Sequence, residues 1–113
     1  MSMSYNCAIP GCKQPADKLP DGAAGFCSDH FAMAPASQRE RFLTVLRRLR
    51  ALREIWSDEA RYDAIVASGR YLKLAHATCC AEEALDMAAQ RLTLAIIAVQ
   101  NSASHGASLR RIA

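Results

Sequence analysis

The chain has 113 residues, of which 51% are hydrophobic and only 6% are aromatic, and its formal net charge is +3. A chain of this length forms one compact domain, or a very small module joined to a slightly larger one. It contains no run of 18 apolar residues, so we expect no transmembrane helix. No basic segment followed by an apolar one appears near residue 1, so we expect no signal peptide and a cytoplasmic location.

The first 34 residues carry four candidate metal ligands, Cys7, Cys12, Cys27 and His30. They form a Cys-x4-Cys pair and a Cys-x2-His pair, and two short-spaced pairs can converge on one tetrahedral ion. Three thiolates and one imidazole would fill every position around the ion, which is typical of structural rather than catalytic zinc. The segment has too few large apolar residues to fold around its own core. We therefore predict a zinc-binding module over residues 1–34, although unrelated cysteines near one histidine are the alternative.

The local sequence around these ligands is typical of a small zinc finger. Pro10 and Gly11 predict a tight turn between the first two cysteines. Ser28 or Asp29 is a plausible N-cap, which would place His30 in the first turn of a short helix. A turn, a loop and a ligand pair at a helix start form the layout of a treble clef or short zinc ribbon.

Residues 38–56 have the pattern of an amphipathic helix. Ser37 followed by Glu40 is a capping-box signature. Apolar residues then recur at three- and four-residue steps and predict one buried stripe: Phe42, Val45, Leu46, Leu49, Leu52 and Trp56. Residues 37–57 carry six arginines and two glutamates, which gives this segment a net charge of +4.

Five of these arginines are candidates for contact with a partner or with phosphate groups: Arg39, Arg47, Arg48, Arg50 and Arg53. The alternative is an ordinary solvated helix face, because Glu40 and Glu54 can pair with neighbouring arginines. No exposed aromatic residues are interleaved, so stacking on single-stranded nucleic acid is not expected.

We predict two further helices, a short one over residues 58–68 and a long one over residues 70–100, followed by a flexible basic tail over residues 101–113. The long helix carries an inner seam of five residues spaced by seven: Tyr71, Thr78, Leu85, Leu92 and Val99. Its partner is either the arginine-rich helix of the same chain, giving a helical hairpin over residues 35–100, or a second copy in a homodimer. The predicted fold is therefore mainly α, with a small finger in front of a helical hairpin.

The remaining residues that could bind a metal or take part in catalysis do not indicate a second site. Cys79 and Cys80 lie in an alanine-rich helical pattern and are expected to be small, mostly buried fillers. His76, Cys79 and Glu83 share a helix face, but no second ligand pair accompanies them, so a second metal site is not expected. No phosphate-binding glycine loop, dinucleotide fingerprint or nucleophile elbow is present, so we expect no enzymatic activity.

One resemblance bears on function. The motifs that carry it are Cys7-Ala-Ile-Pro-Gly-Cys12, Gly25-Phe-Cys27-Ser-Asp-His30-Phe31, and Ser68-Gly-Arg-Tyr71. They resemble those of small zinc-finger proteins of bacteriophages and prophages, although the loop between the ligand pairs is longer here. The resemblance implies a regulatory or inhibitory protein, in the host cytoplasm if phage-encoded, that binds a host or phage protein or a nucleoprotein complex. The alternative is a small DNA-binding transcriptional regulator that uses the finger and the arginine-rich helix.

Overall fold

The computed structural model describes the backbone at residues 5–20 and 25–112, and side chains at residues 6–20 and 25–102. Two short strands, β1 (Tyr5–Asn6) and β2 (Pro15–Ala16), pair antiparallel with Tyr5 opposite Ala16. Four helices follow: α1 (Ser28–Met33), α2 (Ala36–Ser57), α3 (Glu59–Ala67) and α4 (Tyr71–Ile112). The predicted fold class is confirmed: the described chain is mainly helical, and the four ligands precede a helical hairpin.

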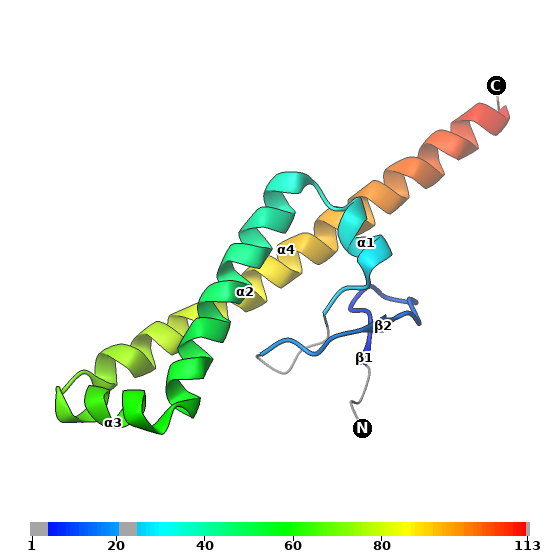
Figure 1. Cartoon of the computed structure of the whole chain (residues 1–113). Coiled ribbons are helices and arrows are strands. Elements are labelled where there is room, and N and C mark those ends of the chain that lie inside the picture. Colours follow the sequence, from blue (N-terminus) through cyan, green and yellow to red (C-terminus); the bar gives the residue numbers. More distant parts are fainter. Residues whose placement is uncertain (1–4, 21–24, 113) are drawn as a thin grey trace.

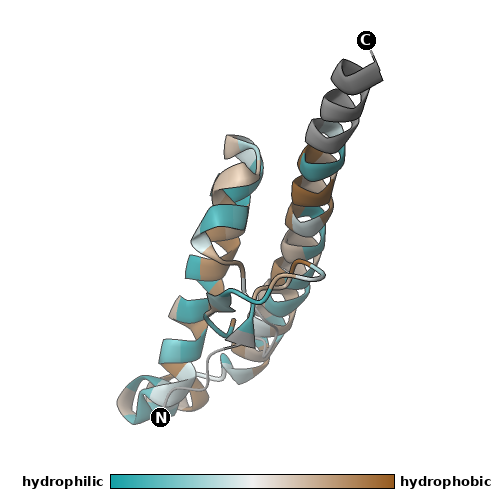
Figure 2. Ribbon diagram, turned by 90° about the vertical axis from the view of Figure 1, so that its right-hand side faces the viewer, coloured by the Kyte–Doolittle hydropathy of each residue, from teal (hydrophilic) through white to brown (hydrophobic). Residues whose placement is uncertain are grey.

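The two long helices α2 and α4 lie side by side and form the hairpin, and α3 closes one of its ends (Figure 1). The strands and α1 make a head that covers one side of the hairpin. Both long helices alternate hydrophilic and hydrophobic segments, as expected of helices with one buried face (Figure 2). The molecule measures 70 × 31 × 16 Å and is therefore elongated. Across the described parts of the chain, no helix is long and apolar enough to cross a membrane.

The helix boundaries follow local chemistry, with two corrections to the predicted caps. Cys27 itself caps α1, because its side chain accepts from the backbone N–H of His30. The predicted capping box at Ser37 is wrong, since α2 already begins at Ala36 after Pro35, whose carbonyl accepts from the N–H groups of residues 38 and 39. Asp58 caps α3, because its side chain accepts from the N–H of Arg61, and Gly69, with a φ of +75°, separates α3 from α4.

The last helix is longer than predicted. Helix α4 continues to Ile112, whereas we expected it to end at residue 100 before a flexible tail. Gly106 does not end the helix, because a single glycine costs only about 1 kcal/mol in a helix interior and no proline follows it. The side chains of Arg110 and Arg111 lie outside the described residues.

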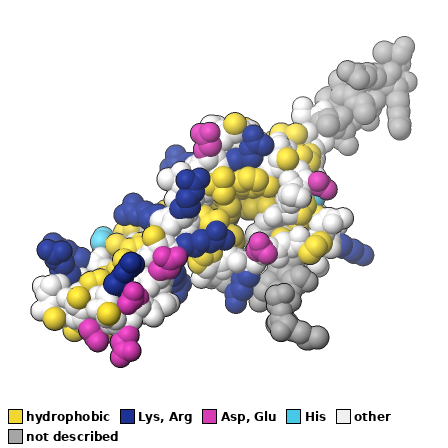
Figure 3. All heavy atoms as spheres, viewed as in Figure 1, with side chains coloured by type: hydrophobic (Ala, Val, Ile, Leu, Met, Phe, Trp, Pro, Cys, Tyr) yellow, Lys and Arg dark blue, Asp and Glu magenta, His cyan; other side chains and the backbone are white. Residues whose placement is uncertain are grey.

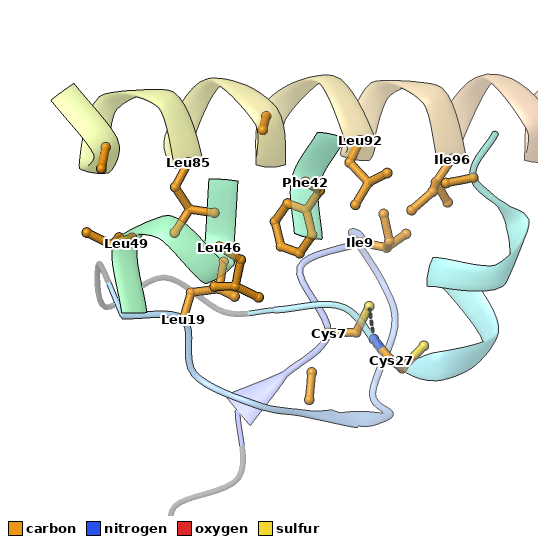
Figure 4. Packing of buried hydrophobic residues seen from close by; sticks show 14 residues of the cluster. Cys7, Ile9, Leu19, Cys27, Phe42, Leu46, Leu49, Leu85, Leu92 and Ile96 are labelled. Atoms are coloured by element: carbon orange, nitrogen blue, oxygen red, sulfur yellow. Dashed lines mark hydrogen bonds between the residues drawn. The ribbon is translucent and has the colours of Figure 1, made fainter. Parts of the chain in front are cut away.

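The core joins the hairpin to the head. Its centre is made of four side chains with essentially no exposed surface: Leu49, Leu85, Leu92 and Ile96. Ile9 and Leu19 of the head point into the same cluster, beside Phe42 of α2 (Figure 4). The head therefore adds its few apolar side chains to the core of the hairpin.

The inner seam of α4 packs against α2 of the same chain. Leu85 and Leu92 are completely buried, Thr78 is buried, and α4 packs along α2. Only the two ends of the seam, Tyr71 and Val99, are exposed. The middle of the seam therefore packs within the hairpin, and self-association through its two ends stays a prediction.

Polar groups at the closed end of the hairpin are satisfied. Trp56 Nε1 donates to Thr78 Oγ1 at 2.8 Å, and the Thr78 hydroxyl donates to the carbonyl of Leu74 at 2.8 Å. The rings of Trp56, Tyr62 and Tyr71 meet with centroids 5.7–6.3 Å apart. This aromatic cluster fixes α3 against the ends of α2 and α4.

Candidate metal centre

The four predicted ligands come from three places in the head and converge on one point. Cys7 directly follows β1, and Cys12 ends the turn after it. Cys27 caps α1, and His30 lies in the first turn of that helix. Each residue offers one ligand atom, and all four atoms lie within 4.8 Å of one another. The cluster can therefore hold a metal ion.

Backbone hydrogen bonds shape the turn that carries the first two cysteines. Gly11 has a φ of +82°, which favours glycine, and the N–H of Cys12 donates to the carbonyl of Ile9 at 3.1 Å. The N–H of Ala8 donates to the carbonyl of Gly25 at 2.8 Å. This bond holds the turn against the chain that leads into Cys27.

Two of three distances between ligand atoms are close to those around a tetrahedral ion, and the third is shorter. A metal bound at about 2.3 Å from sulfur and about 2.0 Å from nitrogen separates its ligand atoms by about 3.5–3.8 Å. The Sγ atoms of Cys12 and Cys27 are 3.9 Å apart, and Cys7 Sγ lies 3.6 Å from His30 Nδ1. Cys27 Sγ lies 3.1 Å from the same nitrogen. His30 therefore presents Nδ1, rather than Nε2, to the three sulfurs.

Backbone N–H groups donate to the sulfur atoms of two ligands. The N–H of Cys27 donates to Cys7 Sγ at 3.3 Å, and the N–H of His30 donates to Cys27 Sγ at 3.5 Å. Burial alone would raise the pKa of Cys7, but the N–H groups of Cys27 and Ile9, together with the thiols of Cys27 and Cys12, outweigh it, so the pKa is lowered. Cys7 and Cys27 are both 6% exposed, so they form the protected side of the site.

The pKa of Cys12 is shifted in the opposite direction from that of Cys7. A hydrogen bond from the backbone of Gln14 lowers its pKa, but burial and the neighbouring thiols of Cys27 and Cys7 outweigh that effect, and the pKa is raised. Several thiols at this separation cannot all ionise easily, because each new negative charge is close to the others. A bound cation removes this obstacle by pairing with all of the thiolates.

The far side of the imidazole ring connects the head to α4. His30 Nε2 lies 3.0 Å from the side-chain amide of Gln100, a residue 70 positions later in the chain. If Nδ1 binds a metal, Nε2 carries the ring proton, so Gln100 must turn its amide oxygen toward the ring to accept it. Sequence reasoning missed Gln100, because a single glutamine in an alanine-rich helix carries no signal of its own.

Apolar packing surrounds the polar cluster. Phe42 of α2 contacts both Phe26 and Phe31, with ring centroids 5.6 Å and 6.1 Å away. These rings also line a cleft of about 170 Å³ between the head and α2, whose polar lining residues are Asp17 and Arg50. Figure 3 shows an apolar hollow here, with both basic and acidic side chains around it.

The five predicted contact arginines do not behave as one set. Arg39 donates to the carbonyl of Ala32 at 3.1 Å, and Arg53 forms an ion pair with Glu82 of α4. Both therefore support the fold. Arg47, Arg48 and Arg50 are exposed and have no hydrogen-bond or ion-pair partner among the described residues.

The prediction that Cys79 and Cys80 are mostly buried is wrong. Cys79 and Cys80 are both exposed, because their positions face away from α2. Cys80 Sγ lies 3.5 Å from His76 Nε2, and Cys79 Sγ lies 4.0 Å from Glu83. Within the described residues, only one group of three or more His, Cys, Asp or Glu side chains is close enough together to hold a metal, and it is the cluster in the head.

No membership of a known family follows from the sequence or the fold. Comparison of the chain with protein-family models, with curated proteins and with solved structures gives no match.

Proposed function

We propose that the cluster of Cys7, Cys12, Cys27 and His30 binds one structural zinc ion. The observation that carries this proposal is the approach of four ligand atoms to within 4.8 Å of one another. Thiolate and imidazole ligands in tetrahedral arrangement are the set that zinc prefers. Four protein ligands leave no open position for water or substrate, which supports a structural role and argues against catalysis at the metal.

The ion would hold together parts of the head that have little else to hold them. The strands have two residues each and α1 has six. Helices this short are not stable alone in water, and two-stranded sheets are marginal. Through His30 and Gln100, the same ion would also fix the head against α4.

Metal analysis and cobalt substitution test the zinc proposal. The purified protein should contain about one zinc per chain, and cobalt in its place should give the visible absorption of a tetrahedral thiolate site. Cys27→Ser should lose the metal, whereas Cys79→Ser, at an exposed cysteine outside the cluster, should retain it. A protein that is folded without metal and whose melting is unchanged by a chelator would contradict the proposal.

We further propose that the protein is a non-enzymatic, phage-type regulatory or inhibitory protein that binds a macromolecular partner, either a protein or a nucleoprotein complex. Two structural features support a binding surface on α2: the apolar cleft beside the head, and three exposed arginines without partners in the described chain. The phage assignment and the inhibitory role are supported by the motif resemblance alone.

A pull-down from bacterial lysate, carried out with wild type and with a triple arginine variant as bait, tests this second proposal. Wild type should enrich one defined protein, and replacement of Arg47, Arg48 and Arg50 by alanine should reduce that enrichment without changing the melting temperature. Arg39→Ala is not a suitable control, because Arg39 is bonded within the fold. If wild type and the triple variant captured equal amounts of the partner, the three arginines would not be part of the binding surface.

Direct DNA binding is the second candidate, and the same three arginines favour it. Contacts to phosphate predict an affinity for duplex DNA that falls steeply as salt rises. Fluorescence anisotropy with a labelled duplex at low salt measures this directly. The candidate fails if no binding is seen there, or if the triple arginine variant binds as well as wild type.

A further inference from the structure

The cleft between the head and α2 is lined mainly by apolar side chains (Figure 3). Phe42 and Leu46 of α2 are the buried part of this lining. Phe26 and Phe31 of the head and Leu43 of α2 are half-buried, so they still expose apolar surface beside the core. A partner that covers this surface gains the free energy of removing it from water.

Two backbone hydrogen bonds fix the head side of the cleft. The N–H of Gly25 donates to the carbonyl of Asp17 at 2.8 Å, and the Gly25 carbonyl accepts from the N–H of Ala8. Gly25 and Asp17 are so close that a Cβ at residue 25 would lie 2.7 Å from that carbonyl oxygen. Ala8 belongs to the turn between the metal ligands Cys7 and Cys12. This wall of the cleft is therefore formed before any partner binds, and it is bonded directly to the metal centre.

The rim of the cleft carries opposite charges on its two sides. Arg50 lines the α2 side and Asp17 lines the head side. Both side chains are exposed, and neither has a hydrogen bond or an ion pair among the described residues. Arg47, also without such a partner, comes four residues after Leu43 and three before Arg50, so these three side chains share one side of α2. A partner in the cleft therefore meets two positive groups on one side and one negative group on the other.

The size and the charges of the cleft fit a peptide side chain better than a small molecule or a nucleic acid. Its volume is about 170 Å³, whereas small-molecule sites have roughly 300–1,000 Å³. The carboxylate of Asp17 repels the phosphate groups of a nucleic-acid strand. A peptide instead can present an acidic side chain to Arg47 and Arg50 and a backbone N–H to Asp17.

We propose that this cleft binds an acidic peptide segment of a partner protein, which inserts one large apolar side chain between the head and α2. An acidic residue beside that side chain pairs with Arg50 and Arg47 at the rim. Because it identifies the macromolecular partner as a protein, the proposal rests on the proposed function. The structural metal takes part in this binding, since two of its ligands lie in the turn that is bonded to Gly25.

Selection from a random peptide display library on the zinc-loaded protein tests this proposal. The enriched peptides should share one large apolar residue beside an aspartate or a glutamate, and a labelled synthetic copy should bind in fluorescence anisotropy. Replacement of the apolar residue of that peptide by alanine should weaken binding about 10-fold or more, because an anchor side chain carries much of the binding energy. No enrichment, or enrichment of basic or wholly polar peptides, would overturn the proposal.

Two matched pairs of variants show whether the peptide occupies the cleft. Leu43→Lys should abolish binding, whereas Leu94→Lys, at an exposed leucine of α4 outside the cleft, should leave it unchanged. Arg50→Glu should weaken binding about fivefold. Arg48→Glu changes the net charge equally, but Arg48 does not line the cleft, so its effect should be smaller.

A reversed charge in the peptide completes this comparison. Lysine in place of the acidic residue of the peptide should restore binding to Arg50→Glu, because the two charges are then opposite again. Equal binding of the original peptide by wild type, Leu43→Lys and Arg50→Glu would show that it binds elsewhere, and the proposal would be wrong.

Metal content and lysate capture separate failure of this proposal from failure of the proposed function. Each variant should keep about one zinc per chain, and loss of peptide binding with the metal retained supports the cleft as the binding site. If lysate capture depends on the three exposed arginines but not on Leu43, the partner-binding function stands and the cleft proposal fails. A labelled thymidine oligonucleotide that binds wild type but not Leu43→Lys would make the cleft a nucleic-acid site, which also overturns the proposal.

Discussion

The head and the hairpin are stabilised by different means. The hairpin buries Leu49, Leu85, Leu92 and Ile96 completely between two long helices. The head has two-residue strands, one six-residue helix and few apolar side chains, and its four ligand atoms lie within 4.8 Å of one another. A segment too short to bury a core of its own is where a bound metal ion would add most stability, whereas long helices that pack together are stabilised by their buried side chains.

The two regions are nevertheless joined. Ile9 and Leu19 of the head belong to the same apolar cluster as Phe42 of α2 (Figure 4). Hydrogen bonds from Arg39 to Ala32 and between Gln100 and His30 connect the same two regions. Loss of the metal should therefore release the head without unfolding the hairpin, and four predictions test this separation.

Chelation of the metal should have the largest effect, and the effect should be confined to the head. We expect limited proteolysis to cut within residues 5–34, while far-UV circular dichroism retains most of its helical signal because α2 and α4 hold most of the helix. Mass spectrometry of the fragments locates the cuts. Cooperative loss of the whole helical signal on chelation would show that head and hairpin are one unit.

Leu85→Ala should damage the hairpin instead. Deleting a completely buried leucine costs about 2–5 kcal/mol, because a cavity replaces lost contacts. Urea unfolding followed by circular dichroism measures this, and metal content should stay near one ion per chain. Leu94→Ala is the matched control and should change stability by less than about 0.5 kcal/mol, since Leu94 is exposed.

Gln100→Ala should weaken the connection between the two regions. A residue that orients a metal-bound histidine typically contributes about 10-fold or more to metal affinity. Competition with a chromophoric chelator measures this affinity. Gln90→Ala, at an exposed glutamine of α4 outside the cluster, should leave the metal affinity unchanged, and Gln100→Glu, which keeps an oxygen acceptor, should restore part of the loss. If all three variants bound the metal as tightly as wild type, Gln100 would have no role in metal binding.

Trp56→Phe should have the smallest effect. It removes the donor to Thr78 Oγ1 while keeping an aromatic ring, so the expected cost is about 1 kcal/mol. Thr78 retains its own bond to the carbonyl of Leu74. Thermal melting should fall by a few degrees, with metal binding unaffected. A change in metal affinity would mean that the closed end of the hairpin communicates with the head.

Much of this architecture could be predicted from local patterns. The two ligand pairs depend on spacings of five and three residues within the chain, and the structure brings these four side chains together as predicted. The apolar stripe of α2 and the inner seam of α4 repeat with the helical period, so their burial also follows from the sequence. The cap at Asp58 and the break at Gly69 are local backbone effects, which need no tertiary information.

Other features depend on which surfaces meet. The same repeat in α4 fits an intrachain or an interchain partner, and only the fold shows that α2 occupies the inner seam. Cys79 and Cys80 were expected to be buried, but the direction of packing leaves them exposed.

The composition of the chain and the spacing of its ligands determined a mainly helical protein with one Cys3His cluster, because helical period and ligand geometry are short-range properties. The tertiary structure alone decided which nitrogen of His30 faces the sulfurs, and that Gln100, 70 residues away, meets the other. Contacts at such separations depend on how the head packs against the hairpin, and no local pattern encodes that arrangement.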